Sequence, residues 1–143
     1  MNVFNTQTGS IEVPNKWSFN IYFSGCKNNK KCDRHLCHNK ELMDFSYGVH
    51  YLSIVDDIID KLKVSQGLVE CICLLGGEPF DQDLKCLQDF IRLINIFNLP
   101  VYAYTGYDDM SIIEDFMKHL NLTDVFYGPY LQEQKNQKWY SEV

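Results

Sequence analysis

Three cysteines crowd one loop in the first third of the sequence. Cys26, Cys32 and Cys37 lie within twelve residues, directly after a segment with strand character. Such short spacing makes closure of the loop around a metal entropically cheap. A [4Fe-4S] cluster held by three cysteines leaves one iron open to a small molecule, whereas a structural zinc site is closed by four ligands. The count therefore favours a cluster that takes part in chemistry.

Two other interpretations of this loop stay open. Zinc could bind the three cysteines with His35 or His38 as a fourth ligand, or the cysteines could carry no metal. The other cysteines stand in a different context, since Cys71 and Cys73 share one face of an apolar strand and Cys86 lies on an amphipathic helix. Cysteine that binds no metal is among the most buried residue types, so we expect these three to pack in the core.

Three lysines, Lys27, Lys30 and Lys31, share the loop with the cysteines. A charge run of this kind usually forms a solvated face, and we expect exposed side chains here. The alternative is a basic patch that meets an acidic reductant or partner protein.

A second motif, Gly76-Gly77-Glu78-Pro79, ends an apolar run. Two glycines allow a close approach of the backbone to a ligand, and Glu78 adds an acceptor for an ammonium or hydroxyl group. The competing interpretation is a tight strand-to-helix turn with Pro79 as the first helical residue, and the motif alone favours that turn.

Apolar periodicity predicts the elements that position these motifs. We expect, in chain order, a strand at 17–23, a helix at 49–64, a strand at 68–75, a helix at 84–97, a strand at 101–104, a helix at 112–120 and a strand at 124–127, with turns around a short strand in 1–15. Helices between strands imply right-handed crossovers and a mainly parallel sheet. Four strands are too few to close, so we predict an α/β fold built as an open partial (β/α) barrel.

The turns that follow the strands should meet at one edge of that sheet, where ligands bind in folds of this class. These turns are the cysteine loop at 25–39, the Gly-Gly-Glu-Pro turn, Thr105-Gly106-Tyr107 and the turn that begins at Gly128-Pro129. The chemistry of all four segments is thereby predicted to converge.

Composition limits the class of protein. A chain of 143 residues fits one domain, 1–143, and a net charge of −6 with a pI of about 5.1 argues against a nucleic-acid partner. The polar N-terminus has no signal-like apolar segment, and no apolar run is long enough for a membrane span. We therefore expect a cytoplasmic protein in a reducing compartment, where clustered cysteines indicate a metal or redox site.

The order Gly25-Cys26, Cys32, Cys37-His38-Asn39, then Gly76-Gly77-Glu78-Pro79, then Tyr104-Thr105-Gly106-Tyr107 resembles the radical SAM superfamily. Within it, the chain is most similar to the activating proteins of anaerobic (class III) ribonucleoside-triphosphate reductases. The cysteine spacing here is Cys-x5-Cys-x4-Cys, two residues longer in each interval than the family's usual Cys-x3-Cys-x2-Cys.

The resemblance implies a radical SAM-like fold, two cofactors and a set of site residues. Cys26, Cys32 and Cys37 would hold a [4Fe-4S] cluster, and S-adenosyl-L-methionine would chelate its open iron. The residues implied to contact S-adenosyl-L-methionine are Gly76, Gly77 and Glu78 on the methionine side, Leu36, Cys37 and His38 on the adenine side, and Thr105.

The implied activity is that of an oxidoreductase that activates a glycyl-radical enzyme. An external, flavodoxin-like one-electron donor would reduce the cluster, and the large reductase subunit would receive the radical on a glycine. Two alternatives are a zinc-stapled protein-binding module and a radical SAM enzyme that acts on another peptide or small substrate.

Overall fold

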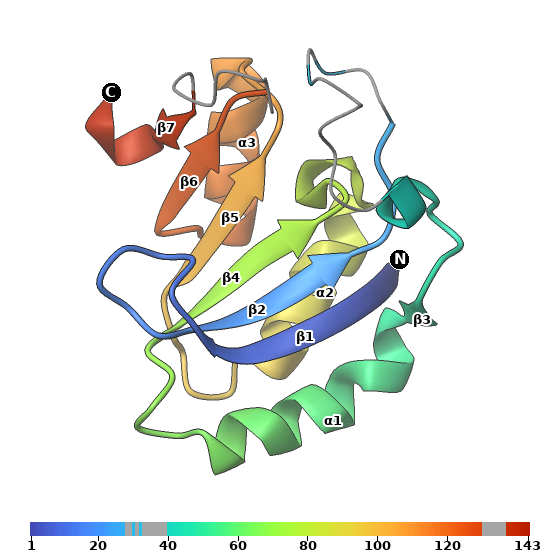
Figure 1. Cartoon of the computed structure of the whole chain (residues 1–143), viewed down its shortest axis with the longest axis vertical. Helices are drawn as coiled ribbons and strands as arrows, with labels where there is room; N and C mark the ends of the chain where they lie inside the picture. The colour runs from blue at the N-terminus through green and yellow to red at the C-terminus, as the bar shows by residue number, and fades with distance from the viewer. Residues whose placement is uncertain (28–29, 31, 33–39, 130–136) are drawn as a thin grey trace.

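The computed structural model describes residues 1–27, 30, 32, 40–129 and 137–143 of the chain. Its central feature is one seven-stranded sheet with the strand order β3-β1-β2-β4-β5-β6-β7. The strands are β1 (Asn2–Ser10), β2 (Ser18–Phe23), β3 (Val49–His50), β4 (Cys71–Gly76), β5 (Val101–Thr105), β6 (Asp124–Tyr127) and β7 (Lys138–Trp139). The two ends of the sheet do not meet, so it is an open α/β sheet (Figure 1).

The four central strands, β2, β4, β5 and β6, run parallel to one another. The outer strands pair antiparallel: β1 with β2 and β3, and β7 with β6. Because parallel strands share a direction, the carboxyl ends of all four central strands lie at one edge of the sheet (Figure 1).

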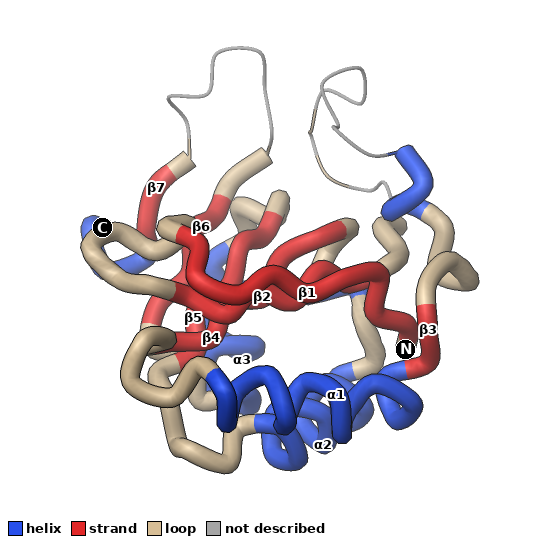
Figure 2. Tube along the Cα trace, turned by 60° about the horizontal axis from the view of Figure 1, so that its bottom comes forward, coloured by secondary structure: helices blue, strands red, loops and turns tan. Residues whose placement is uncertain are grey.

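Three helices cover one face of this sheet: α1 (Tyr51–Val64), α2 (Leu84–Ile94) and α3 (Met110–Leu120). Figure 2 shows them together on the same side. The side chains of His50, Asp83 and Asp109 cap their first turns by accepting backbone N–H bonds. Short 3-10 helices lie at η2 (Lys40–Met43), η3 (Pro79–Asp81) and η5 (Tyr140–Glu142).

The main core lies between the helices and the sheet. Its fully buried side chains come from alternate strand positions and from the inner helix faces, and include Phe19, Phe23, Ile72, Leu74, Leu87, Phe90 and Ile113. Alternation along each strand sends the other half of the side chains to the opposite face. That face carries a smaller cluster of Val13, Cys71, Cys73, Leu75 and Tyr102.

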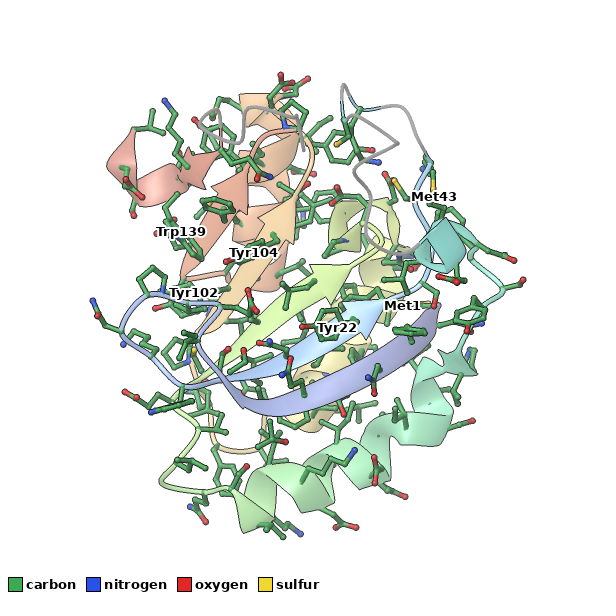
Figure 3. The ribbon with its side chains drawn as sticks, in the orientation of Figure 1. Met1, Tyr22, Met43, Tyr102, Tyr104 and Trp139 are labelled. Atoms are coloured by element: carbon green, nitrogen blue, oxygen red, sulfur yellow. The ribbon has the colours of Figure 1, made fainter. Side chains whose placement is uncertain are left out.

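Aromatic side chains cover much of the helix-free face. Figure 3 shows Tyr22, Tyr102, Tyr104 and Trp139 spread over it, and Trp139 packs edge-on against both Tyr102 and Tyr104. The Tyr104 hydroxyl donates to the Glu12 carbonyl at 2.5 Å, which ties the β1–β2 loop over this face. The C-terminal segment, through Trp139, therefore covers part of the sheet face that carries no helix.

The structure confirms the expected alternation of strands and helices and a mostly parallel central sheet that is not closed. The closest agreement is β6, which spans the predicted 124–127. Some expectations are wrong: the N-terminal segment is a nine-residue strand that pairs along β2, and the sheet has seven strands. β4 begins only at Cys71, because the N–H groups of Leu68 and Val69 donate to the Ser65 carbonyl in a turn after α1. In the described part of the chain, no helix has the length and apolar character of a membrane span.

Candidate metal centre

The described cysteines of the loop lie at the carboxyl edge of the sheet. Cys26 follows β2, and its backbone N–H donates to the Met43 carbonyl at 3.3 Å, at the end of η2. Cys32 lies against the end of β5, since its Sγ is 3.0 Å from the position that a Cβ would occupy on Gly106. Cys26 and Cys32 therefore lie near the ends of β2 and β5, and both are partly exposed there.

Three of the predicted site residues, Leu36, Cys37 and His38, lie outside the described residues. Within the described ranges, no three or more His, Cys, Asp or Glu side chains are grouped as a metal site would require. The roles predicted for these residues, including Cys37 as the third ligand, stay predictions.

The two glycines of the Gly-Gly-Glu-Pro turn pack against the stem of the cysteine loop. The Gly77 N–H donates to the Phe23 carbonyl at 2.7 Å, and the Glu78 N–H donates to the Gly25 carbonyl at 2.9 Å. A Cβ on Gly77 would lie 2.3 Å from the Leu42 carbonyl oxygen. The close approach that these glycines allow is thus to the chain's own backbone, and their contact with S-adenosylmethionine stays a prediction.

Glu78 connects the ends of β4 and β5 through its buried carboxylate, which is 2% exposed. Its Oε1 accepts from the Gly106 N–H and its Oε2 from the Thr105 hydroxyl, both at 2.7 Å. Oε2 also accepts from the Phe80 N–H at 3.1 Å, so Glu78 is the N-cap of η3 with Pro79 as its first residue. This is the strand-to-helix turn that the motif alone favours.

The buried position of Glu78 governs its protonation. Burial raises the pKa of its carboxyl group from 4.5 to about 7, although the bonds from Gly106 and Thr105 work in the opposite direction. The structure thus brings Glu78 and Thr105 together at the predicted site, where the Glu78 carboxylate is hydrogen-bonded to Thr105 and Gly106.

The structure reveals a buried ionic group that the sequence did not predict. The Asp81 side chain is fully buried, and its carboxylate accepts from the Lys27 backbone N–H at 2.8 Å, from the Lys30 ammonium and from the Tyr107 hydroxyl. Lys30 is 3% exposed at its side chain, which corrects the expectation of a solvated lysine face at this position. Lys27 is exposed, as expected.

Lys30 also lies beside a cysteine of the loop. Its Nζ is 3.6 Å from the Cys26 Sγ and 4.5 Å from the centre of the Tyr107 ring. Burial acts to lower the pKa of Lys30, but the bond to Asp81 and the negative charges around it outweigh that effect and raise it. Lys30 is therefore an ammonium group at neutral pH.

Core packing is confirmed for Cys71 and Cys73, whereas Cys86 is only partly buried. Cys71 and Cys73 are fully buried on the helix-free face of the sheet, and Cys86 packs against the main core from α2. Burial raises the pKa of the Cys71 thiol to about 11, and burial likewise raises the pKa of Cys73. These thiols stay protonated at neutral pH, which is the wrong state for a metal ligand.

The donor chemistry at the sheet edge fits an iron-sulfur cluster. Cys26 and Cys32 offer sulfur atoms, and soft sulfur ligands select Fe–S clusters, zinc or copper(I). The Lys30 ammonium lies 3.6 Å from one of the two sulfurs, that of Cys26.

Comparison with known proteins gives the family. A search of curated proteins found no match. A family model described as a 4Fe-4S single cluster domain matches residues 17–142, which include the cysteine loop and all four central strands. The chain therefore belongs to the 4Fe-4S single cluster domain family.

Proposed function

We propose that this protein is a radical SAM oxidoreductase that installs a glycyl radical on a large anaerobic ribonucleotide reductase subunit. The observation that carries the proposal is the position of the cysteine loop. Cys26 and Cys32 lie at the carboxyl edge of the parallel strands, next to the turns that begin at Gly76 and Thr105. A cofactor bound by this loop would therefore lie where α/β sheets of this kind bind their ligands.

Cys26, Cys32 and Cys37 would hold the cluster, with S-adenosylmethionine on its open iron. Once reduced by an external one-electron donor, a cluster bound there would supply the electron that cleaves the sulfonium C–S bond to methionine and a 5′-deoxyadenosyl radical, and that radical would take a hydrogen atom from a glycine Cα. The donor is proposed to be flavodoxin-like, and the products on the two proteins are 5′-deoxyadenosine and a stored glycyl radical. The protein contributes binding, orientation and the exclusion of water.

Hydrogen bonds within the chain hold the turns at the carboxyl edge of the sheet in place. Glu78 links the end of β4 to the end of β5 through Thr105 and Gly106. The Gln82 Nε2 donates to the Ser24 carbonyl at 3.1 Å, which fixes the backbone just before the cysteine loop. Groups that are bonded in this way need little reorganisation when a ligand arrives.

The shape of the sheet favours a protein substrate. The sheet is open, and its helices cover one face only (Figure 2). Small substrates are usually enclosed over most of their surface by a pocket. We propose that the substrate is instead a macromolecule that itself covers the site, such as a large reductase subunit that presents its glycine on a loop.

Anaerobic purification followed by iron and zinc analysis is the first test. We expect a brown protein with four irons per cluster. Reduction in the presence of S-adenosylmethionine should release 5′-deoxyadenosine, and addition of the reductase from the same organism should give a glycyl-radical EPR signal. A colourless protein with stoichiometric zinc would instead make the chain a zinc-stapled binding module. Release of 5′-deoxyadenosine without a glycyl radical would indicate another peptide or a small molecule as the substrate.

A further inference from the structure

We propose that Lys30 is a positioning residue for the cluster: its ammonium group anchors the cysteine loop to Asp81 and donates a hydrogen bond to the Cys26 sulfur. The proposal rests on the cluster of the proposed function but not on S-adenosylmethionine or on the partner. It assigns a specific task to a lysine whose sequence context favoured a solvated charge.

The first argument is the anchoring of the loop. Five residues separate Cys26 from Cys32, so the spacing by itself leaves the path between the two sulfurs loosely defined. Asp81, on η3, holds this interval at two points by accepting from the Lys27 backbone N–H and from the Lys30 side chain. Both anchor points come from the same buried carboxylate, so Lys27 and Lys30 are held to η3.

The second argument is burial. The Lys30 and Asp81 side chains are 3% and 0% exposed, so their two opposite charges are paired away from water. Removal of one partner from a buried pair leaves an uncompensated charge and is strongly destabilising. Tyr107 adds a third contact to each, since its hydroxyl donates to Asp81 and its ring lies under the Lys30 ammonium. A lysine held this firmly does not sample other orientations easily.

The third argument is the charge next to the sulfur. The Lys30 Nζ lies 3.6 Å from the Cys26 Sγ, within reach of an N–H···S bond. An ammonium group at this distance would donate a charge-assisted hydrogen bond to that sulfur when a cluster is bound. Hydrogen bonds to cluster sulfurs also set the reduction potential, because they stabilise the more negative, reduced state. Lys30 should therefore raise the potential of the cluster as well as strengthen its binding.

The test compares Lys30→Met and Lys30→Arg with Lys27→Met in the reconstituted protein. Lys30→Met keeps the length of the side chain and removes the charge, while Lys27→Met removes the same charge from an exposed neighbour that contributes only its backbone N–H. We expect Lys30→Met to lower the midpoint potential in an EPR-monitored redox titration. It should also retain iron about 10- to 100-fold less well against a chelator, the range typical of partners that orient metal ligands.

Lys30→Arg should restore part of the potential, since it returns the charge, and Lys27→Met should match the wild type. A purely structural role of Lys30 would weaken iron retention but would leave the midpoint potential of the remaining clusters unchanged. Equal potentials in Lys30→Met and Lys27→Met would therefore overturn the inference.

Tyr107→Phe keeps the test decisive if Lys30→Met does not fold. This variant retains the ring under Lys30 and removes only the hydroxyl that holds Asp81, so we expect a smaller shift of the potential in the same direction. Hydrogen exchange at the Lys27 amide, which donates to Asp81, should also be faster than in the wild type. An unchanged potential together with unchanged exchange would overturn the proposal. A wild-type protein that takes up zinc and no iron would refute the proposed function as well, whereas normal cluster loading without any effect of Lys30 would refute this inference alone.

Discussion

Gly77→Ala tests directly how the cysteine loop is held on the sheet. An added Cβ would lie 2.3 Å from the Leu42 carbonyl oxygen and 2.5 Å from the Gly25 carbonyl oxygen. Both are backbone atoms, so no rotation of a side chain relieves the overlap. Gly77 is not among the glycines with a positive φ, which means that the overlap itself, and not backbone strain, carries the effect.

The size of the effect follows from two contributions. Overpacking of a closely packed site destabilises by about 1–3 kcal/mol. The movement that relieves it must also lengthen the hydrogen bond from the Glu78 N–H to the Gly25 carbonyl, 2.9 Å long, and such a bond contributes about 1 kcal/mol. We therefore expect Gly77→Ala to lower the free energy of unfolding by about 2–4 kcal/mol.

Urea unfolding followed by circular dichroism measures this loss, with Gly67→Ala as the matched control. Gly67 has a φ of +91° and no atom within 4 Å of an added Cβ, so its substitution introduces backbone strain of about 1–2 kcal/mol without a steric overlap. A loss in Gly77→Ala no greater than in Gly67→Ala would refute the packing argument. If Gly77→Ala showed no such extra loss and yet failed to bind S-adenosylmethionine, Gly77 would serve a ligand and not the loop.

The other predictions concern the cysteines and Glu78. Cys26→Ala and Cys37→Ala should each abolish cluster binding as measured by iron content, whereas Cys73→Ala should keep its iron and lose about 1 kcal/mol of stability; equal iron loss in all three would mean that ligand and core cysteines are assigned wrongly. The pKa of Glu78 is about 7 in the folded state and 4.5 ordinarily, so between pH 4.5 and 7 the folded protein binds more protons than the unfolded chain. The free energy of unfolding should therefore fall by about 3 kcal/mol as the pH rises through this window, relative to the Glu78→Gln variant. A carboxyl carbon-13 titration that places this pKa below 5 would contradict the prediction. Thr105→Val removes a hydrogen-bond donor from the Glu78 carboxylate and should raise the same pKa further in the same titration.

Local sequence was enough to predict most of the elements behind the site. The three helices and the four parallel strands follow from the spacing of apolar residues, a property that each segment carries within itself. The convergence of the strand-end turns also followed, because parallel strands place their carboxyl ends together. The Gly128 N–H donates to the Tyr107 carbonyl at 3.0 Å, a direct contact between two of those turns.

Strands that depend on a distant partner were not predictable from the sequence. β3 and β7 have two residues each and exist as strands only through their pairing with β1 and β6. β1 carries the polar run Asn5-Thr6-Gln7-Thr8, which lacks an apolar pattern, and its length is set by the register along β2. Strand pairing of this kind is decided by neighbours that no local window contains.

The same distinction applies to the site. Residue types and spacing determined by themselves that a three-cysteine loop follows β2 and that Cys71 and Cys73 belong to the core. Only the tertiary structure decided that Lys30 is buried, because its compensating charge, Asp81, lies 51 residues further along the chain. Nothing within the loop distinguishes Lys30 from the exposed Lys27, since a lysine becomes a buried ammonium only when folding brings a carboxylate to it.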